Sequence, residues 1–118
     1  MPLATGSRHC DSGPAAEVID RAHLARMTFG EQSLARELLE LFDRQAVTLL
    51  VRLREGGAET AALAHTLKGS AGGIGAWRVM RAAENCERAA GGSAAAIDGL
   101  VLAVEEARAA IAEILAAD

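Results

Sequence analysis

The chain has 118 residues and a formal net charge of −4, with two phenylalanines, one tryptophan and no tyrosine. This length favours one domain, and the acidic balance with so few aromatic residues excludes a basic or base-stacking surface for nucleic acid. No apolar run approaches the roughly 18 residues of a membrane span, and residues 1–16 lack the apolar stretch of a signal peptide. We therefore expect a cytoplasmic protein without a membrane or nucleic-acid partner.

The composition favours helices throughout the chain. Alanine, the best helix former, occurs 27 times, whereas β-branched residues are sparse. An all-α fold is therefore predicted. The two cysteines, Cys10 and Cys86, are expected to be free thiols in a reducing compartment.

The N-terminal part of the chain is predicted to contain a flexible lead and a short helix. Residues 1–16 carry glycine, serine and proline and form the lead, so that the folded domain spans residues 17–118. Asp20 is suited to cap a short helix that ends before Gly30. Three large apolar residues there either frame a docking patch for a partner or seal the end of the domain: Leu24, Met27 and Phe29.

Four longer helices follow, each with apolar residues at helical spacing. Glycine clusters separate them, and Ser93 is a good cap for the last. Their predicted ranges are about 31–54, 58–71, 76–90 and 93 to the C-terminus. Short connections between amphipathic helices predict an antiparallel four-helix bundle, with the short N-terminal helix as an addition. A self-contained bundle of this kind is expected to be a monomer.

Two of these helices show the apolar pattern most clearly. The first has an apolar stripe of Leu34, Leu38, Leu41, Phe42, Leu49 and Leu53. In the third, the positions expected to point inward are Trp77, Met80, Ala83 and Cys86.

The segment Ala64-His65-Thr66-Leu67-Lys68-Gly69-Ser70-Ala71 is the most informative part of the chain. It holds the only lysine, whereas the other eleven of the 12 basic residues are arginines. Lys68 follows His65 by three residues, so the two side chains share one face of the helix. The other neighbours on that side are small: Ala61, Gly69 and Gly72.

Glycine at position 69 does not favour a helix, since it lowers helix stability by about 1 kcal/mol relative to alanine. Close approach of another surface to the imidazole of His65 is one physical reason to accept it. The other histidines, His9 and His23, have no comparable neighbours.

This arrangement suits the transfer of a phosphoryl group. A neutral imidazole is a nucleophile near neutral pH, and its attack on an acyl phosphate would give phosphohistidine. Lys68 is a compact cation able to stabilise the phosphate oxygens, and such transfer depends mainly on positioning and charge. A carboxylate on the next helix would accept Nδ1–H and leave Nε2 to react. Glu84 and Glu87 are the candidates, and Glu84 is also placed for local ion pairs with Arg81 or Arg88.

The His65 segment, followed by Gly73-Ile74-Gly75-Ala76, resembles the signature of histidine-containing phosphotransfer (HPt) domains. The likeness extends over roughly residues 17–116 and includes Val18-Ile19-Asp20, Leu38-Leu39-Glu40-Leu41-Phe42 and Glu84-Asn85-Cys86-Glu87. It implies a four-helix bundle that relays phosphoryl groups between response-regulator receiver domains, or from a hybrid histidine kinase. Gly72-Gly73 departs from the family, in which many members have a larger or amide residue.

The resemblance also implies a role for each residue of the motif. His65 matches the phosphorylated histidine, Lys68 the lysine that stabilises the phosphate, and Gly69 the small residue that admits the partner's aspartate. Glu87 matches the Glu or Gln that often hydrogen-bonds the histidine from the next helix. The protein is then expected to need no cofactor or metal of its own, and the Mg²⁺ would be held by the partner receiver domain.

Two other interpretations remain. A non-catalytic helical interaction module of the same fold would not need His65. The phosphoacceptor hairpin of a sensor kinase usually has an acidic residue directly after its histidine, where this chain has Thr66. The chain has no Gly-rich phosphate loop with GK[ST] and no kinase signature, so no autonomous kinase activity is expected. It would be a relay intermediate rather than a stand-alone enzyme.

Overall fold

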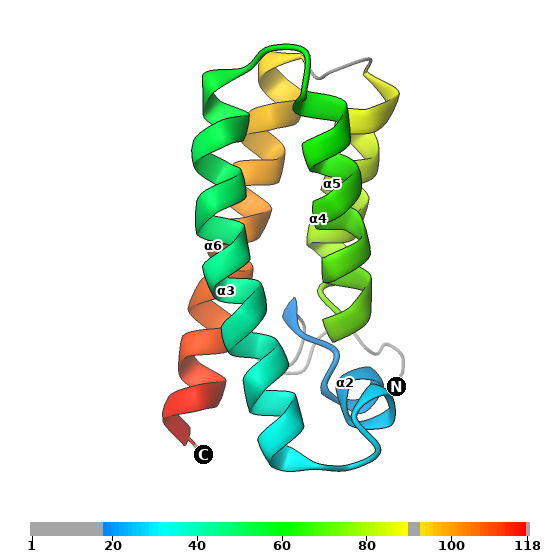
Figure 1. Ribbon diagram of the computed structural model, residues 1–118, viewed down its shortest axis with the longest axis vertical. Coiled ribbons are helices and arrows are strands. Elements are labelled where there is room, and N and C mark those ends of the chain that lie inside the picture. Colours follow the sequence, from blue (N-terminus) through cyan, green and yellow to red (C-terminus); the bar gives the residue numbers. More distant parts are fainter. Residues whose placement is uncertain (1–17, 90–92, 118) are drawn as a thin grey trace, which may run out of the picture.

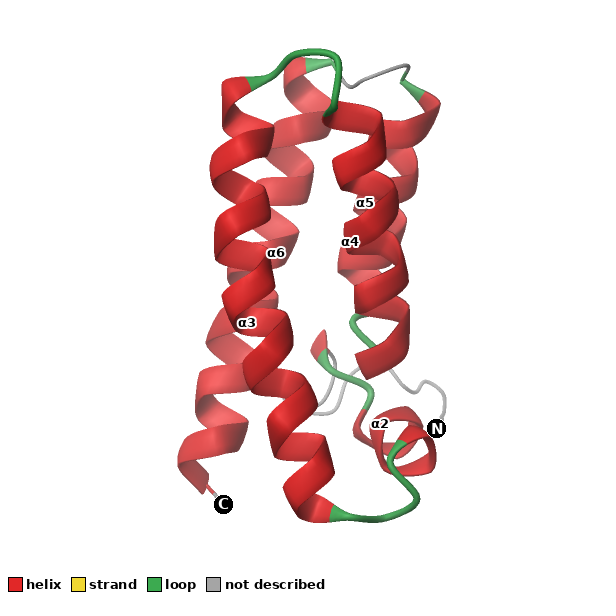
Figure 2. Cartoon of the chain, in the orientation of Figure 1, coloured by secondary structure: helices red, strands yellow, loops and turns green. Residues whose placement is uncertain are grey.

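The computed structural model describes residues 18–89 and 93–117, and within them all regular structure is helical (Figure 2). This confirms the predicted all-α fold. The helices are α2 (Arg21–Met27), α3 (Gln32–Glu55), α4 (Thr60–Ile74), α5 (Trp77–Arg88) and α6 (Ala94–Ala117). The predicted lead, residues 1–16, lies outside the described residues. No described helix combines the length and apolarity needed to cross a membrane.

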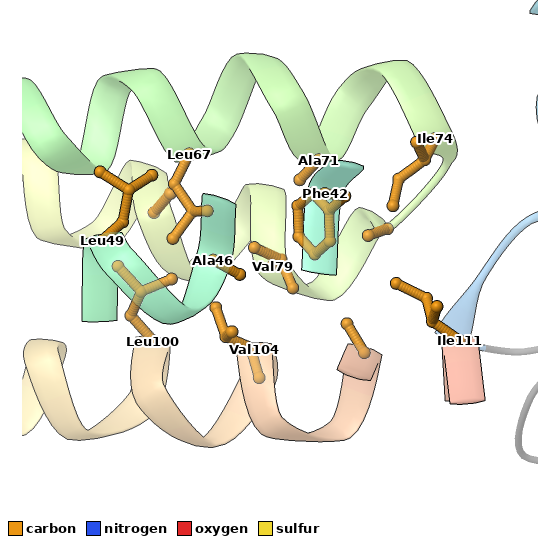
Figure 3. Close-up of a cluster of buried hydrophobic side chains, with 14 of the residues drawn as sticks. Phe42, Ala46, Leu49, Leu67, Ala71, Ile74, Val79, Leu100, Val104 and Ile111 are labelled. Atoms are coloured by element: carbon orange, nitrogen blue, oxygen red, sulfur yellow. The ribbon is translucent and has the colours of Figure 1, made fainter. Parts of the chain in front are cut away.

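Helices α3 to α6 form the antiparallel bundle, and α2 lies at the end where α3 begins (Figure 1). Helix α3 packs against α4 and α6, while α5 packs against the same two helices from the other side. The four helices meet in one apolar core (Figure 3), which includes Phe42, Leu67, Val79 and Val104. Each fully buried side chain of this size contributes roughly 1.5–3 kcal/mol relative to an exposed one.

Helix α3 buries only part of its apolar stripe. Phe42, Leu49 and Leu53 are buried as expected, but the side chain of Leu41 is 53% exposed. Leu39 is buried in the core although the predicted stripe did not include it. Leu41 is about 100° around the helix from Phe42, so it lies to the side of the core. The sequence pattern shows which residues are apolar, but the packing of α4 and α6 decides which of them are covered.

Helix α4 extends three residues beyond its predicted end at residue 71. Of the three glycines expected to break it, Gly72 and Gly73 do not, whereas Gly75 does. Both glycines are helical, and the helix ends at Gly75, whose φ of 80° is left-handed. The amides of Gly75 and Ala76 both donate to the carbonyl of Ala71. Glycine lowers helix propensity by only about 1 kcal/mol, which the burial of Ile74 in the core offsets.

Helix α5 buries a set of residues that only partly matches the predicted one. Ala83 and Cys86 are buried as expected, but Val79 completes the inward face, and Trp77 and Met80 are half-buried. Cys86 is a free thiol that donates to the carbonyl of Ala96 at 3.2 Å. Burial raises the pKa of this thiol. Cys10 lies outside the described residues.

Two predicted helix caps are confirmed. The Asp20 carboxylate accepts the His23 amide at 3.0 Å at the start of α2. The Ser93 hydroxyl accepts the Ala96 amide at 3.1 Å at the start of α6. A side-chain acceptor at this position satisfies one of the free amides at a helix N-terminus.

Asp20 also ties α2 to the turn between α4 and α5. Its second carboxylate oxygen accepts the indole N–H of Trp77 at 3.0 Å, and its own amide donates to the Gly75 carbonyl at 3.0 Å. The hydrogen bonds from the His23 amide and from Trp77 lower the pKa of Asp20. A Cβ atom at position 75 would lie 2.8 Å from the Asp20 Cβ, so only glycine permits this close approach.

His23 strengthens the same junction, although the sequence suggested no role for it. Its Nε2 donates to the carbonyl of Gly72 at 2.9 Å, and its ring lies 4.8 Å from that of Trp77. We refer to Asp20, His23 and Trp77 as the α2 clasp, because together they hold α2 against the end of α4.

The three apolar residues at the end of α2 differ in burial. Leu24 is buried and seals the bundle, whereas the side chains of Met27 and Phe29 are 51% and 86% exposed. Phe29 also has a φ of 56°, a left-handed conformation that costs a non-glycine residue roughly 1–2 kcal/mol. Met27 and Phe29 therefore contribute little to the core.

Candidate functional site

His65 lies near the middle of α4 and points away from the bundle core. Ala64, Leu67 and Ala71 form the buried side of the same helix, and the His65 side chain is 70% exposed. Because the rest of α4 is anchored by its apolar side, the imidazole is presented on a rigid element to any approaching molecule.

Glu87, in the last turn of α5, connects His65 with Lys68. One carboxylate oxygen lies 2.8 Å from Nδ1 of His65, and the other lies 2.8 Å from Nζ of Lys68. The lysine and the glutamate are half-buried between α4 and α5. The structure thus brings together three residues that the sequence selected, and it chooses Glu87 over Glu84 as the neighbour of His65.

The contact with Glu87 determines which nitrogen of the ring is available. A carboxylate accepts hydrogen bonds, so Nδ1 carries the proton in the neutral ring and donates it to Glu87. The lone pair then lies on Nε2, for which the described part of the chain offers no hydrogen-bond partner. The arrangement leaves a nucleophilic nitrogen facing solvent.

The charge of Glu87 is itself stabilised by its neighbours. The hydrogen bond from Lys68, followed by that from His65, holds the pKa of this carboxyl below its ordinary value of 4.5. Glu87 is therefore ionised at neutral pH. Lys68 is paired with Glu87 rather than free in solution, and its ammonium group is held one helical turn from His65.

Gly69 and Gly72 differ in what surrounds them, although the sequence grouped them together. A Cβ atom at Gly69 would meet no atom within 4 Å, so the fold does not require glycine there. At Gly72 a Cβ atom would contact the sulfur of Met80 at 3.5 Å, and the Gly72 carbonyl binds His23. Gly72 therefore belongs to the packing of α4 on its neighbours, while Gly69 is exposed next to the site.

Two further observations concern residues near the site. Within the described residues, Glu84 forms no ion pair with Arg81 or Arg88, and Arg88 donates instead to Asn85 at 2.8 Å.

Ser70 donates to the side chain of Gln45 at 2.7 Å and so ties α4 to α3. Sequence reasoning missed the latter contact, because no local pattern connects residues 25 positions apart.

No group of three His, Cys, Asp or Glu side chains suited to a metal ion occurs in residues 18–89 and 93–117. The chemistry of the site is that of an exposed imidazole with a fixed tautomer and an adjacent cation. The fold and the site thus define a class, a helical bundle that presents a nucleophilic histidine on its outer surface.

The comparison with known families gives this class a name. The family model for the Hpt domain matches residues 33–117, which is most of the chain, and the protein belongs to this family. Hpt domains serve histidine phosphotransfer in two-component systems, where they interact with receiver domains and kinases. Searches of curated proteins and of solved structures gave no match.

Proposed function

We propose that His65 accepts a phosphoryl group from the aspartyl phosphate of a receiver domain and passes it to the aspartate of another. A hybrid histidine kinase that carries a receiver domain is one such donor. The observation that carries this proposal is the 2.8 Å contact between Nδ1 of the exposed His65 and Glu87. This contact explains why Nε2 of His65 would be the reactive nitrogen. The exposed His65 side chain has no role in the core of the bundle.

The transfer step uses the tautomer that Glu87 favours. The lone pair of Nε2 forms a bond to phosphorus while the bond from phosphorus to the aspartate oxygen breaks, and the carboxylate leaves with the electron pair. The Nδ1 proton remains shared with Glu87, which stabilises the positive charge that develops on the ring. Passing the group to a second aspartate reverses these changes. The Mg²⁺ that assists the reaction is expected on the receiver domain.

Lys68 has two acceptors during this cycle. In the unphosphorylated protein it pairs with Glu87 at 2.8 Å. A phosphoryl group on Nε2 would bring a stronger negative charge to the same face of α4, so Lys68 would then turn toward it. Glu87 thus holds the lysine close to the position where the phosphoryl oxygens arrive, and little movement is needed.

Phosphotransfer from isolated receiver domains tests the proposed function. Receiver domains from the source genome, labelled by a small-molecule phosphodonor in the presence of Mg²⁺, would be mixed with the protein. We expect at least one of them to transfer label within minutes, and the label to be lost in acid and kept in alkali, as phosphohistidine is. Absence of label with every receiver domain, or label that survives acid, would refute the proposal.

Substitution of Glu87 tests its orienting role. We expect Glu87→Ala to lower the initial rate of label transfer roughly tenfold, because a charge-assisted hydrogen bond contributes about 1.5–3 kcal/mol and 1.4 kcal/mol is tenfold in rate. Glu87→Gln keeps an acceptor for Nδ1–H without the charge, so its rate should be intermediate. Glu84→Ala on the same helix is the matched control and should transfer at the wild-type rate. Equal rates for Glu87→Ala and Glu84→Ala would contradict the assignment.

A further inference from the structure

Glu87 faces the one nitrogen of His65 that does not react, and its chemical nature limits what can happen there. Its two carboxylate oxygens lie 2.8 Å from Nδ1 of His65 and 2.8 Å from Nζ of Lys68. The hydrogen bonds from Lys68 and His65 lower the pKa of this carboxyl, so it is ionised at neutral pH. Glu87 therefore acts only as a hydrogen-bond acceptor toward the ring.

The proton on Nδ1 has two possible fates once a phosphoryl group is attached. The neutral ring carries its proton on Nδ1, and the attack by Nε2 gives a phosphorylated ring with a positive charge that still holds this proton. The ring can then keep the proton, or release it to water and become neutral. The group that faces Nδ1 decides between these two forms.

A carboxylate and an amide differ in this respect. Glu87 can bind Nδ1 only while the proton is present, because a deprotonated Nδ1 would place its lone pair against a negative oxygen at 2.8 Å. An amide at position 87 could accept from the protonated ring through its oxygen, and could equally donate to the deprotonated ring through its NH2 group. The carboxylate thus favours one protonation state of the phosphorylated ring, whereas an amide tolerates both.

No other charged side chain in the described part of the chain competes with Glu87 for the ring. Helices α2, α3 and α5 pack against α4, and among their charged groups only Glu87 contacts His65. On α4 itself, Lys68 shares the face of His65, and its charge opposes a positive ring. Phosphoryl oxygens on Nε2 would attract Lys68 and offset that charge, which leaves the carboxylate of Glu87 to the ring alone.

We propose that Glu87 keeps the proton on Nδ1 throughout the cycle, so that phosphorylated His65 remains positively charged in the ring at neutral pH. This inference rests on the proposed function. A protonated ring leaves phosphorus as a neutral imidazole and is therefore the better leaving group. Phosphorylated His65 is then a strong phosphoryl donor with a short lifetime, suited to passing the group on rather than storing it.

Slow loss of the label to water follows the same bookkeeping. Water attacks phosphorus, the bond from phosphorus to Nε2 breaks, and Nε2 takes the electron pair. Inorganic phosphate leaves with both protons of the water, and the ring returns to the neutral form with its proton on Nδ1. No proton has to be recovered from solvent, so the rate of loss should change little with pH around neutrality while Glu87 is present.

The lifetime of the label in the wild type and in Glu87→Gln tests this proposal. Phosphoramidate, which phosphorylates histidine directly, labels the protein without a receiver domain, and His65→Gln gives the background from the other histidines. We expect the rate of loss to fall at a lower pH in Glu87→Gln, because its ring releases the proton more easily. Its label should persist roughly tenfold longer than that of the wild type near pH ~8, which corresponds to a difference of about one unit in that pH.

Glu84→Gln on the same helix is the matched control and should lose its label as the wild type does. Identical pH profiles for the wild type and Glu87→Gln would overturn the proposal, as would faster loss from Glu87→Gln or an equal shift in Glu84→Gln. Wild-type labelling no higher than the His65→Gln background would overturn it as well, since Nε2 would then not be available.

The equilibrium distribution of label provides a second readout. Each protein is mixed with the same receiver domain, and the ratio of labelled protein to labelled receiver domain is measured between about pH 6.5 and 8.5. Dividing the ratio of Glu87→Gln by that of the wild type cancels the pH dependence of the receiver domain. The quotient should rise with pH, because only the variant releases a proton when it takes the phosphoryl group.

A general base acting on water is the main alternative role for Glu87. It would slow label loss in Glu87→Gln by one factor at every pH in this range and leave the quotient constant, and that result would overturn the proposal. The lifetime experiment needs no receiver domain. Label from phosphoramidate but from no receiver domain would therefore refute the proposed function, whereas identical pH profiles would refute only this inference.

Discussion

His65→Gln should abolish phosphotransfer and leave the bundle intact. Glutamine has similar polarity and size, but its amide nitrogen is not a nucleophile, so transfer should fall by roughly 10³-fold or more, as when other nucleophiles are removed. The side chain of His65 is 70% exposed, so the free energy of unfolding should change by less than about 0.5 kcal/mol. Label transfer and urea unfolding of the same preparation measure the two effects.

His9→Gln is the control for this experiment, because it also removes one of the three histidines. We expect it to be labelled at the wild-type rate. Acid-labile label on His65→Gln at the wild-type level would place the phosphoryl group elsewhere and remove the basis of the mechanism.

Gly69→Leu should change stability and transfer in opposite directions. A Cβ atom at Gly69 meets no other atom within 4 Å, so a side chain can begin there without a clash. The better helix propensity of leucine should then raise the free energy of unfolding by about 0.5–1 kcal/mol. The same side chain would hold the partner's aspartate away from His65. A displacement of about 1 Å can lower the rate of a positioned reaction roughly 100-fold, and we expect a loss of that order.

Gly99→Leu on α6 is the matched control, since a Cβ atom there also meets nothing within 4 Å. It should gain similar stability without loss of transfer. Unfolding in urea and single-turnover transfer from a labelled receiver domain would be compared for both variants. Transfer at the wild-type rate in Gly69→Leu would show that position 69 does not limit the approach of the partner.

These two experiments concern the outer face of α4, where the proposed function has a partner approach His65. The helix is anchored by Leu67 and Ala71 in the core, and its outer face carries the exposed His65 and a glycine that the fold does not require. The proposed approach of a partner would account for glycine at position 69 despite its lower helix propensity. Gly75 is different, because its left-handed φ and its contact with Asp20 are needed by the fold.

The helices, the bundle and the common face of His65 and Lys68 could all be predicted from local patterns in the chain. These features depend on contacts between residues three or four positions apart. The spacing of apolar residues and the positions of the glycine clusters indicate such contacts directly. Capping by Asp20 and Ser93 is local in the same sense, and the structure agrees with it.

The orientation of the helices about their own axes could not be predicted in the same way. On α5 the packing buries Val79 and places Glu87, not Glu84, against His65. The position of α2 makes His23 and Trp77 part of a clasp and leaves Met27 exposed at a groove. Such contacts join residues 22 to 57 positions apart. They depend on how several amphipathic surfaces pack simultaneously, which the periodicity of a single helix does not specify.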